Sequence, residues 1–267
     1  MTPRSYLFVP ADRPERFDKA LGCGADAVIV DLEDAVAPEK KDAARSALGE
    51  WLAATRSSVV VRINGVDSPW FRDDLALCTL PAVGAVMLPK AERAQDLAAV
   101  SDGAPGKPLL PLIETAAGFD GMRSVAQAPQ VERLVFGSID FQLDLGISDE
   151  GDALLYFRSR LVLASRLANL AAPVDGVSTS IDDMQSLRSD AERARRLGFG
   201  AKLCIHPKQV ETVNRSFSPS EVEVLWAQRV LDAAARSDGA AVAVDGKMVD
   251  RPVILRAQAL LNMRRAR

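Results

Sequence analysis

Eight short, mainly apolar runs recur along the chain, and a longer segment with helical periodicity follows each of them. A run whose apolar residues do not alternate with polar ones is typical of a parallel strand whose two faces are both covered. The predicted strands span Tyr6–Pro10, Ala27–Asp31, Val59–Ile63, Ala85–Leu88, Leu109–Ile113, Leu134–Ile139, Val174–Val177 and Ala201–Ile205. Eight such units within about 215 residues predict an α/β fold, the (β/α)8 TIM barrel.

The segments between the strands have the periodicity of helices that pack one face against a sheet. The predicted helices span Glu15–Leu21, Glu39–Ala54, Pro69–Leu77, Ala91–Val100, Phe119–Ala126, Ala153–Ala171, Ile181–Leu197 and Pro207–Val213. An open doubly wound sheet is the alternative. However, no GxGxxG follows the first strand, and polar residues end nearly every strand instead of gathering at one switch point. Both observations favour the closed barrel.

The last fifty residues do not continue this rhythm, so we divide the chain into a barrel of residues 1–217 and an extension of residues 218–267. The capping sequence SPSEVE opens a predicted helix over Ser218–Arg236. Gly239–Val244 and the DGKMVDRP that follows predict a hairpin or loop with an Asp-Gly turn, and Pro252 opens a last helix. The extension could act as a lid, as an oligomer contact, or as both.

Composition and charge exclude several kinds of partner. The 33 basic and 36 acidic residues give a net charge of −3, so we do not expect nucleic acid as the main partner. The N-terminal apolar run is too short for a signal peptide or a membrane span, so we expect a cytoplasmic protein without a membrane partner. Cys23, Cys78 and Cys204 are odd in number and widely separated, which favours buried thiols over disulfides or zinc.

Polar residues stand at the carboxyl ends of the predicted strands, where barrel enzymes place their chemistry. The residues at the strand ends are Pro10 and the polar Asp31, Glu33, Asp34, Arg62, Asn64, Lys90, Glu114, Asp140, Ser178 and His206. Any one of them could simply cap the helix that follows. Arg62, Glu114 and Asp140 end three different strands, and for this combination we favour a shared site.

Glu114 and Asp140 supply two carboxylates, with no nearby Cys or His cluster to suggest zinc. Two such ligands on rigid strands suit Mg²⁺, or Mn²⁺ in its place. A metal of this kind polarises a carbonyl and stabilises an enolate. Arg62 adds a planar fork for a carboxylate or a developing oxyanion, and the Gly137–Ser138 turn offers backbone N–H groups. This set suits an enzyme that binds a 2-oxo acid and makes or breaks a carbon–carbon bond beside it.

Other chemistries have less support. Aromatic residues make up 5% of the chain, few for the sugar cleft of a glycosidase. His206 is the only histidine and GxSxG is absent, so a nucleophilic triad lacks its parts. His206 either orients a metal-bound water or forms only local hydrogen bonds. Lys90 could form a Schiff base, but it could equally bind an anion or a neighbouring carboxylate.

The ordered motifs LFVPADRPERFDKA, VDLEDAV, VRING, VMLPKAE, PLIETAAG, FGSID, CIHPKQV and DGKMVDRPV cover nearly the whole chain. The set resembles the citrate lyase β-subunit-like group of the HpcH/HpaI aldolase superfamily, alongside malyl-CoA and citramalyl-CoA lyases. This resemblance implies a barrel assembled as a homotrimer or a multiple of it. It also implies that Mg²⁺ is used to cleave or form a β-hydroxyacyl thioester by aldol or Claisen chemistry.

The resemblance also implies roles for single residues near the expected metal. Glu114 and Asp140 match the metal ligands. Arg62 matches the residue that binds substrate and stabilises the enolate. Glu33 and Asp34 match the acidic motif around the metal waters.

Further residues match positions around this centre. Asp250, in KMVD, matches an acid that related CoA lyases contribute from a neighbouring subunit as general acid or base. Pro10 matches the side of the mouth where the CoA arm enters, and Arg16 and Lys19 would meet its phosphates. Ile139 is the clear departure, since many relatives carry Glu just before the metal Asp, and we expect substrate choice to differ there.

The leading hypothesis is therefore a Mg²⁺-dependent lyase that acts on a malyl-, citramalyl- or related β-hydroxyacyl-CoA and yields a 2-oxo acid and an acyl-CoA. Three alternatives stay open. The chain could be the β subunit of a citrate lyase complex acting on an acyl-carrier-protein thioester, or a CoA-independent class II aldolase. It could also be a non-catalytic barrel that binds a 2-oxo acid or a CoA ester.

Overall fold

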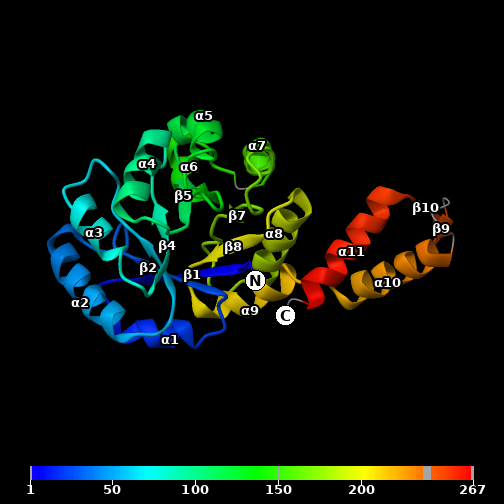
Figure 1. Ribbon diagram of the computed structural model, residues 1–267, viewed down its shortest axis with the longest axis horizontal. Coiled ribbons are helices and arrows are strands. Elements are labelled where there is room, and N and C mark those ends of the chain that lie inside the picture. Colours follow the sequence, from blue (N-terminus) through cyan, green and yellow to red (C-terminus); the bar gives the residue numbers. More distant parts are fainter. Residues whose placement is uncertain (1, 150, 237–241, 266–267) are drawn as a thin grey trace. The chain divides into compact units, whose positions relative to one another are not determined.

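Eight parallel strands form a closed barrel in the computed structural model, which describes residues 2–149, 151–236 and 242–265 (Figure 1). The strands are β1 (Ser5–Pro10), β2 (Ala27–Asp31), β3 (Val59–Arg62), β4 (Val83–Leu88), β5 (Leu109–Ile113), β6 (Val135–Phe136), β7 (Val174–Asp175) and β8 (Ala201–Cys204). Each strand pairs with the next in sequence, and β1 closes the barrel by pairing with β8. The predicted (β/α)8 barrel is confirmed.

Helices follow the strands and cover the outer face of the barrel. They are α1 (Phe17–Leu21), α2 (Lys41–Ala54), α3 (Phe71–Leu77), α4 (Ala94–Gly103), α5 (Ala116–Val125), α6 (Ser138–Leu145), α7 (Leu155–Leu167), α8 (Met184–Leu197) and α9 (Pro207–Ser216). Short 3-10 turns, η1 (Pro14–Arg16), η2 (Pro38–Lys40) and η3 (Asp152–Leu154), lead into α1, α2 and α7. Of the described helices, none combines the length and hydrophobicity that crossing a membrane requires.

The barrel interior is filled with apolar side chains. One buried cluster takes residues from every strand: Tyr6, Ile29, Val60, Met87, Leu110, Leu112, Val135, Val174, Ala201 and Leu203. Successive strand residues point to opposite faces, so the alternate residues face the helices. Each fully buried aliphatic side chain stabilises the fold by about 1.5–3 kcal/mol. Because the interior is packed, polar chemistry has room only at the ends of the strands.

Helix α6 was not predicted from the sequence. The predicted strand Leu134–Ile139 ends in the structure at Phe136, and α6 begins at Ser138. Asp140 therefore lies in the first turn of a helix, and the prediction that it ends a strand was wrong. A short apolar run does not by itself distinguish a strand from a buried helical turn. The helix ends at Leu145 and is capped by Gly146, whose φ of 69° is the left-handed conformation that glycine adopts without strain.

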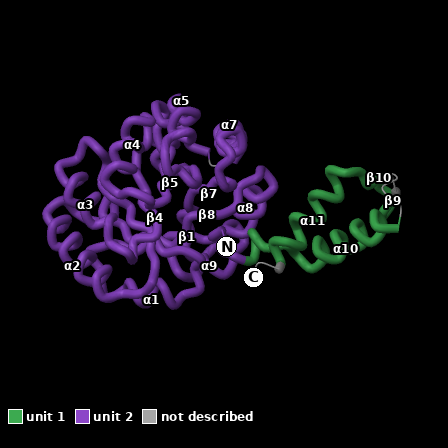
Figure 2. Tube along the Cα trace, in the orientation of Figure 1, with its two compact units in different colours: residues 1, 215–267 green, residues 2–214 purple. Residues whose placement is uncertain are grey.

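The chain separates into two compact units, residues 2–214 and residues 215–267 (Figure 2). In the second unit, α10 (Glu221–Arg236) packs on α11 (Arg251–Arg265), and β9 (Val242–Val244) pairs with β10 (Lys247–Val249).

The hairpin between these helices turns at Asp245 and Gly246. Both residues have positive φ, as the predicted Asp-Gly turn requires. Residues 239–241 of the predicted Gly239–Val244 segment lie outside the described residues. The core of the unit contains Ala227, Val230, Val249, Ala257 and Leu260.

Candidate active site

The carboxyl ends of β2 and β3 bring Asp31 and Arg62 together. The two residues are direct neighbours in the register of these strands. Arg62 Nε donates to Asp31 Oδ1 at 2.7 Å, and Arg62 Nη2 donates to Asp31 Oδ2 at 2.6 Å. This two-bond geometry fixes the plane of the guanidinium.

Asp31 is the partner whose function the sequence did not reveal. Besides binding Arg62, its carboxylate accepts the backbone N–H groups of Glu33 and Ala35 at 2.9 and 3.1 Å. The loop after β2 is therefore folded around it. The available signal was a buried strand ending in Asp directly before LED, but that pattern predicts a helix cap equally well.

Arg62 is buried and surrounded by acids. Its Nη1 lies 3.1 Å from Glu33 Oε2 and 3.6 Å from Asp34 Oδ2. Its guanidinium also lies over the ring of Phe8, 4.9 Å from the centroid. Burial disfavours the charge of Arg62, but its hydrogen bonds to Asp31 and the nearby carboxylates raise its pKa above the ordinary value. Arg62 is therefore a permanently charged and well-oriented group.

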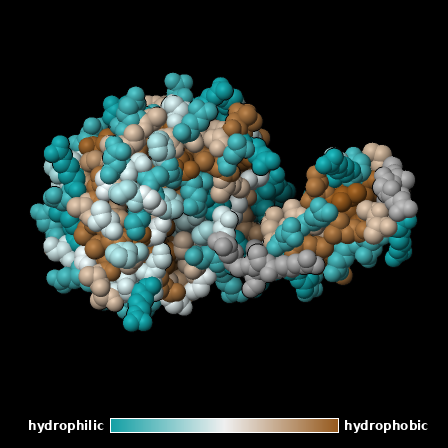
Figure 3. All heavy atoms as spheres, viewed as in Figure 1, coloured by the Kyte–Doolittle hydropathy of each residue, from teal (hydrophilic) through white to brown (hydrophobic). Residues whose placement is uncertain are grey.

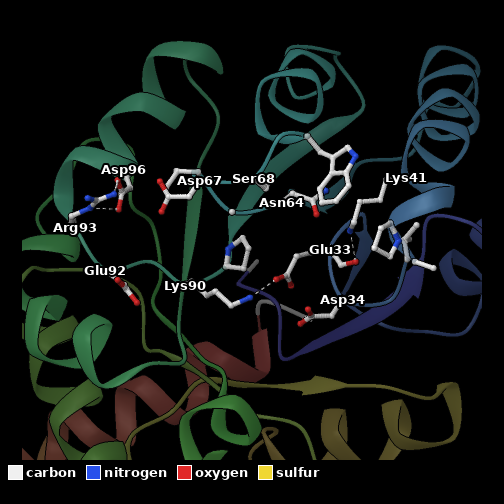
Figure 4. A pocket seen from close by; sticks show the side chains of 17 residues that line it. Glu33, Asp34, Lys41, Asn64, Asp67, Ser68, Lys90, Glu92, Arg93 and Asp96 are labelled. Carbon is white, nitrogen blue, oxygen red and sulfur yellow. Dashed lines mark hydrogen bonds and ion pairs between the residues drawn. The ribbon is translucent and has the colours of Figure 1, made fainter. Parts of the chain in front are cut away.

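Glu33 links Arg62 to Lys90. Its Oε1 accepts a hydrogen bond from Lys90 Nζ at 2.8 Å, and Figure 4 shows the two side chains reaching toward each other. Burial raises the pKa of Glu33, while the charge of Arg62 and the hydrogen bond from Lys90 oppose that rise. Burial lowers the pKa of Lys90, but the hydrogen bond to Glu33 outweighs it and leaves the pKa above its ordinary value. A protonated amine is not nucleophilic, so this geometry disfavours the Schiff base.

Glu114 lies between the end of β5 and the capped start of α5. The Thr115 hydroxyl accepts the Gly118 N–H at 3.0 Å and caps the helix, which holds the backbone of Glu114 in place. The Oε1 atom of Glu114 accepts the backbone N–H of Lys90 at 2.7 Å. No described residue forms a hydrogen bond to its Oε2 atom, although the side chain is only 1% exposed. Burial raises the pKa of Glu114 to about 8.

Asp140 approaches Glu114 from α6. Its charge contributes to the raised pKa of Glu114. The Asp144 carboxylate accepts the Ala116 N–H at 2.7 Å, which ties α6 to the start of α5. A side chain at position 137 would collide with Glu114, since a Cβ there would lie 2.7 Å from its Oε2. Gly137 is thus required for this close approach.

The donor set fits a divalent cation. Five carboxylates, from Asp31, Glu33, Asp34, Glu114 and Asp140, share this region with the two cations Arg62 and Lys90. A buried carboxylate oxygen without a partner costs free energy that a bound cation would recover. Within the described ranges, no three His, Cys, Asp or Glu side chains converge as a ready-made metal cluster. Two carboxylates with water and substrate completing the coordination suit Mg²⁺ or Mn²⁺.

A cavity of about 600 Å³ adjoins this cluster, between the loops that follow β2, β3 and β4 (Figure 4). Glu33, Asp34 and Lys90 belong to both the cluster and the cavity wall, whereas Arg62, Glu114 and Asp140 do not line the cavity. The cavity is large enough for a small organic ligand.

The Gly137–Ser138 turn was predicted to offer backbone N–H groups to a ligand. The Gly137 N–H is donated to Ile113 O at 2.9 Å, so it is not the open donor that we predicted, while Ser138 is buried in the first turn of α6.

His206 Nδ1 accepts the backbone N–H of Lys208 at 3.2 Å. Of the two interpretations of His206, the structure supports the local hydrogen bond.

The remaining predicted residues come from the end of β1, from η1 and α1, and from the other unit. Pro10 ends β1 and is half-buried, while Arg16 and Lys19 are exposed, and none of the three lines the cavity beside Glu33. Asp250 belongs to the unit of residues 215–267. There its Oδ1 accepts the Val253 N–H at 3.2 Å, at the start of α11.

Comparisons with known proteins match the barrel unit for the family model and nearly the whole chain for single relatives. A model of the HpcH/HpaI aldolase/citrate lyase family matches residues 4–207. The citrate lyase subunit beta-like protein of Deinococcus radiodurans is 38% identical over 279 residues, which cover 97% of this chain and 96% of that protein. The (3S)-malyl-CoA thioesterase of Cereibacter sphaeroides is 36% identical over 266 residues, which cover 97% of this chain and 93% of that protein.

A solved structure agrees with these matches. The crystal structure of protein CitE from Mycobacterium tuberculosis in complex with magnesium, acetoacetate and coenzyme A has a TM-score of 0.87 to this chain. It is 35% identical in sequence and covers 98% of this chain, which covers 97% of it. The similarity therefore includes the extension as well as the barrel.

Proposed function

The chain belongs to the HpcH/HpaI aldolase/citrate lyase family, and on that premise we propose that it is a Mg²⁺-dependent carbon–carbon lyase. Its substrate would be a β-hydroxyacyl-CoA such as citramalyl-CoA or malyl-CoA, cleaved to a 2-oxo acid and an acyl-CoA or formed from them. The observation that carries this proposal is the buried, unpartnered Oε2 of Glu114 beside Asp140. The magnesium, acetoacetate and coenzyme A bound to the relative from Mycobacterium tuberculosis support the same classes of ligand.

Glu114 and Asp140 would hold the Mg²⁺ ion. When bound there, it would supply Lewis-acid polarisation of a substrate carbonyl. The backbone N–H of Lys90 holds Oε1 of Glu114, which leaves Oε2 to face a ligand. Glu33 and Asp34, on the neighbouring loop, would accept hydrogen bonds from water in the same site.

Arg62 would bind the carboxylate of the substrate and stabilise the enolate oxygen. Asp31 holds two of its nitrogens, so the fork is oriented before substrate arrives. The third nitrogen, Nη1, faces Glu33 and Asp34 at the cavity side of the cluster. A preorganised cation lowers the barrier because no reorganisation is needed when charge develops.

Asp250 is the candidate general acid or base. In the cleavage direction a carboxylate takes the proton of the substrate hydroxyl. The C–C bond then breaks, and its electron pair remains on the acyl-CoA part as an enolate. The enolate carbon would take a proton back from the general acid to give the acyl-CoA. We propose that Asp250 comes from a neighbouring copy of the chain in a homotrimer or a multiple of it.

The extension of residues 218–267 would serve as the lid and oligomer contact of a catalytic barrel of residues 1–217. Figure 3 shows hydrophobic side chains gathered over α10 and α11. Within that unit Leu225, Met248 and Leu255 are more than half exposed. Exposed apolar side chains of this kind favour a protein partner.

Arg16 and Lys19 would meet the phosphates of the CoA arm. We also propose a cytoplasmic location.

The test is to offer citramalyl-CoA and malyl-CoA to the purified protein with Mg²⁺ and to measure the 2-oxo acid. We expect turnover of at least one substrate, and its loss when EDTA removes the metal. Turnover that survives EDTA, or tight binding of both thioesters without turnover, would overturn the proposal. The second result would favour the non-catalytic binding barrel.

Thioester hydrolysis is a second candidate, favoured by the 36% identity to the (3S)-malyl-CoA thioesterase of Cereibacter sphaeroides. Hydrolysis releases the CoA thiol and a hydroxy acid, whereas the lyase reaction keeps the thioester and releases a 2-oxo acid. A thiol reagent and a 2-oxo acid assay on the same sample separate the two reactions. Thiol release without a 2-oxo acid would replace the lyase by the thioesterase.

An acyl-carrier-protein thioester is a third candidate substrate, because the chain is similar to a citrate lyase subunit beta-like protein. A citrate lyase β subunit works with other subunits, so co-purification of such subunits would favour it. Activity of the isolated chain on free CoA thioesters would count against it.

A further inference from the structure

Lys90 occupies an unusual backbone conformation at the cluster. Its φ is +47°, in the left-handed region that residues with a side chain seldom adopt. It directly follows Pro89, after the end of β4 and before the start of α4. Strained residues of this kind persist only where surrounding contacts hold them, and they gather at functional sites.

The backbone around Lys90 is held by its neighbours. The Lys90 N–H is donated to Glu114 Oε1 at 2.7 Å. The N–H of the next residue, Ala91, is donated to Leu112 O of β5 at 3.1 Å. A Cβ on Gly118 would lie 2.9 Å from the Ala91 oxygen, so the first turn of α5 also packs closely against this segment. The left-handed turn thus places one backbone donor on the candidate metal ligand.

The side chain of Lys90 acts in another direction. Its Nζ lies 2.8 Å from Glu33 Oε1, and Glu33 Oε2 lies 3.1 Å from Arg62 Nη1. Glu33 is buried, and its carboxylate lies between two cations, the Lys90 ammonium and the Arg62 guanidinium. Without the ammonium, only Arg62 of these two cations would attract it. Glycine would adopt this backbone conformation without strain but has no ammonium, which explains a lysine at a strained position.

We propose that Lys90 is a positioning residue that orients Glu114 through its backbone N–H and the Glu33–Arg62 pair through its ammonium. This inference rests on the proposed Mg²⁺ site and lyase reaction. The two contacts are separable, because one belongs to the main chain and the other to the side chain. Lys90 does not form a covalent bond with substrate in this role.

The backbone contact is tested by three neutral variants, Lys90→Gly, Lys90→Met and Lys90→Ile. All three keep the N–H and lack the ammonium, but they differ in tolerance of positive φ, which is lowest for the β-branched Ile. We expect Lys90→Gly to bind Mn²⁺ at least as tightly as Lys90→Met, and Lys90→Ile to bind about tenfold more weakly. Calorimetric titration of Mn²⁺ measures this without turnover. Equal affinity of the Ile and Met variants would overturn the backbone part.

The side-chain contact is tested by kinetics. We expect Lys90→Met to lower kcat about thirtyfold with KM changed less than about threefold, and Lys90→Arg to recover most of the loss. Lys40→Met is the matched control, because Lys40 is 55% exposed against 54% for Lys90 and pairs with Asp12 instead, at 3.6 Å. The control should keep the wild-type kcat.

Further outcomes test the role of Lys90 separately from the proposed metal site and lyase reaction. Wild-type kcat in Lys90→Met would overturn the side-chain part, and so would a kcat loss in Lys90→Met that Lys90→Arg does not recover. A wild-type protein that binds no Mn²⁺, or that turns over neither thioester, would instead overturn the proposed site or reaction. Circular dichroism of each variant checks that the barrel is folded.

Discussion

Two of the buried carboxylates in the barrel unit, Asp175 and Glu114, have their charges balanced in different ways. Asp175 on β7 forms two ion pairs, one on each carboxylate oxygen. Its Oδ1 lies 2.9 Å from Arg158 Nε, and its Oδ2 lies 3.4 Å from Lys202 Nζ. Glu114 receives one backbone N–H on Oε1, and no described residue forms a hydrogen bond to its Oε2. The two acids are similarly buried but differ in whether the protein itself supplies the countercharge.

This difference separates a structural ion pair from a ligand site. Burial disfavours the charge of Asp175, but the charges of Lys202 and Arg158 hold its pKa below the ordinary value. Its partners come from α7 and β8, so the pair fastens a helix and a strand to the barrel wall. At Glu114, burial prevails and raises the pKa to about 8. The fold leaves this buried acid without the countercharge that a bound cation would supply.

The largest expected effect is the loss of activity in Glu114→Gln. The amide keeps the size of the side chain but loses the charge that would bind the metal. We expect the Mg²⁺-dependent rate to fall by at least about a thousandfold, or about 4 kcal/mol. Turnover assays and thermal melts of the same preparation measure rate and folding together. Full activity in Glu114→Gln would remove Glu114 from the metal site.

The next largest effect is the loss of stability in Asp175→Asn. Removing the charge leaves two buried cations without the carboxylate between them, which costs about 3–5 kcal/mol. Urea unfolding measures this cost. The folded fraction should keep its turnover rate, in contrast to Glu114→Gln. The double variant Asp175→Asn, Lys202→Met is the control and should regain part of the stability, because it also removes one of the two cations.

The third prediction concerns pH. Since the pKa of Glu114 is raised to about 8 in the metal-free protein, a proton must leave before a divalent ion binds. We expect Mn²⁺ affinity to fall about tenfold between pH 7 and pH 6. Calorimetry in buffers of different ionisation enthalpy also detects the released proton. Affinity that does not change with pH would contradict the raised pKa.

The folding free energy should depend on pH with opposite sign at the two acids. The pKa of Asp175 is lowered, so its stabilising contribution is present above the pKa of the unfolded chain and is lost as pH falls through the folded value. The pKa of Glu114 is raised, so in the metal-free protein its burial costs stability increasingly as pH rises toward about 8. Asp175→Asn should therefore be most destabilising near neutral pH, where Glu114→Gln should be stabilising.

The smallest effect on stability is expected for Ile139→Glu. This side chain is 37% exposed in the first turn of α6, where an acid is tolerated, so the stability should change by less than about 0.5 kcal/mol. Because it adjoins Asp140, we expect the ratio of kcat/KM for citramalyl-CoA and malyl-CoA to shift about tenfold. Leu143→Glu is the control on the same helix, at 81% exposure. A shift of equal size in the control would show that Ile139 has no special influence on the substrate.

Much of the fold was predictable because it depends on local composition. Eight mainly apolar runs separated by helical segments require a sheet covered on both faces, and the closed barrel satisfies that requirement. The Asp-Gly turn at Asp245 was predictable for the same reason, since few residue pairs accept two positive φ values. The polar strand ends at Arg62 and Glu114 could also be identified from sequence.

The exact partners at the site depend on contacts between distant segments. Asp31 meets Arg62 only because β2 and β3 pair in that register, and the sequence of either strand alone does not specify it. Asp140 was placed at a strand end because a short apolar run is compatible with a strand or a helical turn, and packing selected the helix α6. Lys90 reaches Glu33 and Glu114, 57 and 24 residues away in sequence.

The sequence by itself determined which residue types stand at the mouth of the barrel, because burial of apolar runs favours polar residues at the strand ends. Only the tertiary structure decided which of the charged residues pair with one another. Asp175 forms ion pairs with two cations of the barrel unit, whereas no described residue forms a hydrogen bond to Oε2 of Glu114. The physical reason is that electrostatic pairing depends on distances of a few ångströms between groups from different strands, and these distances are set only when the barrel closes.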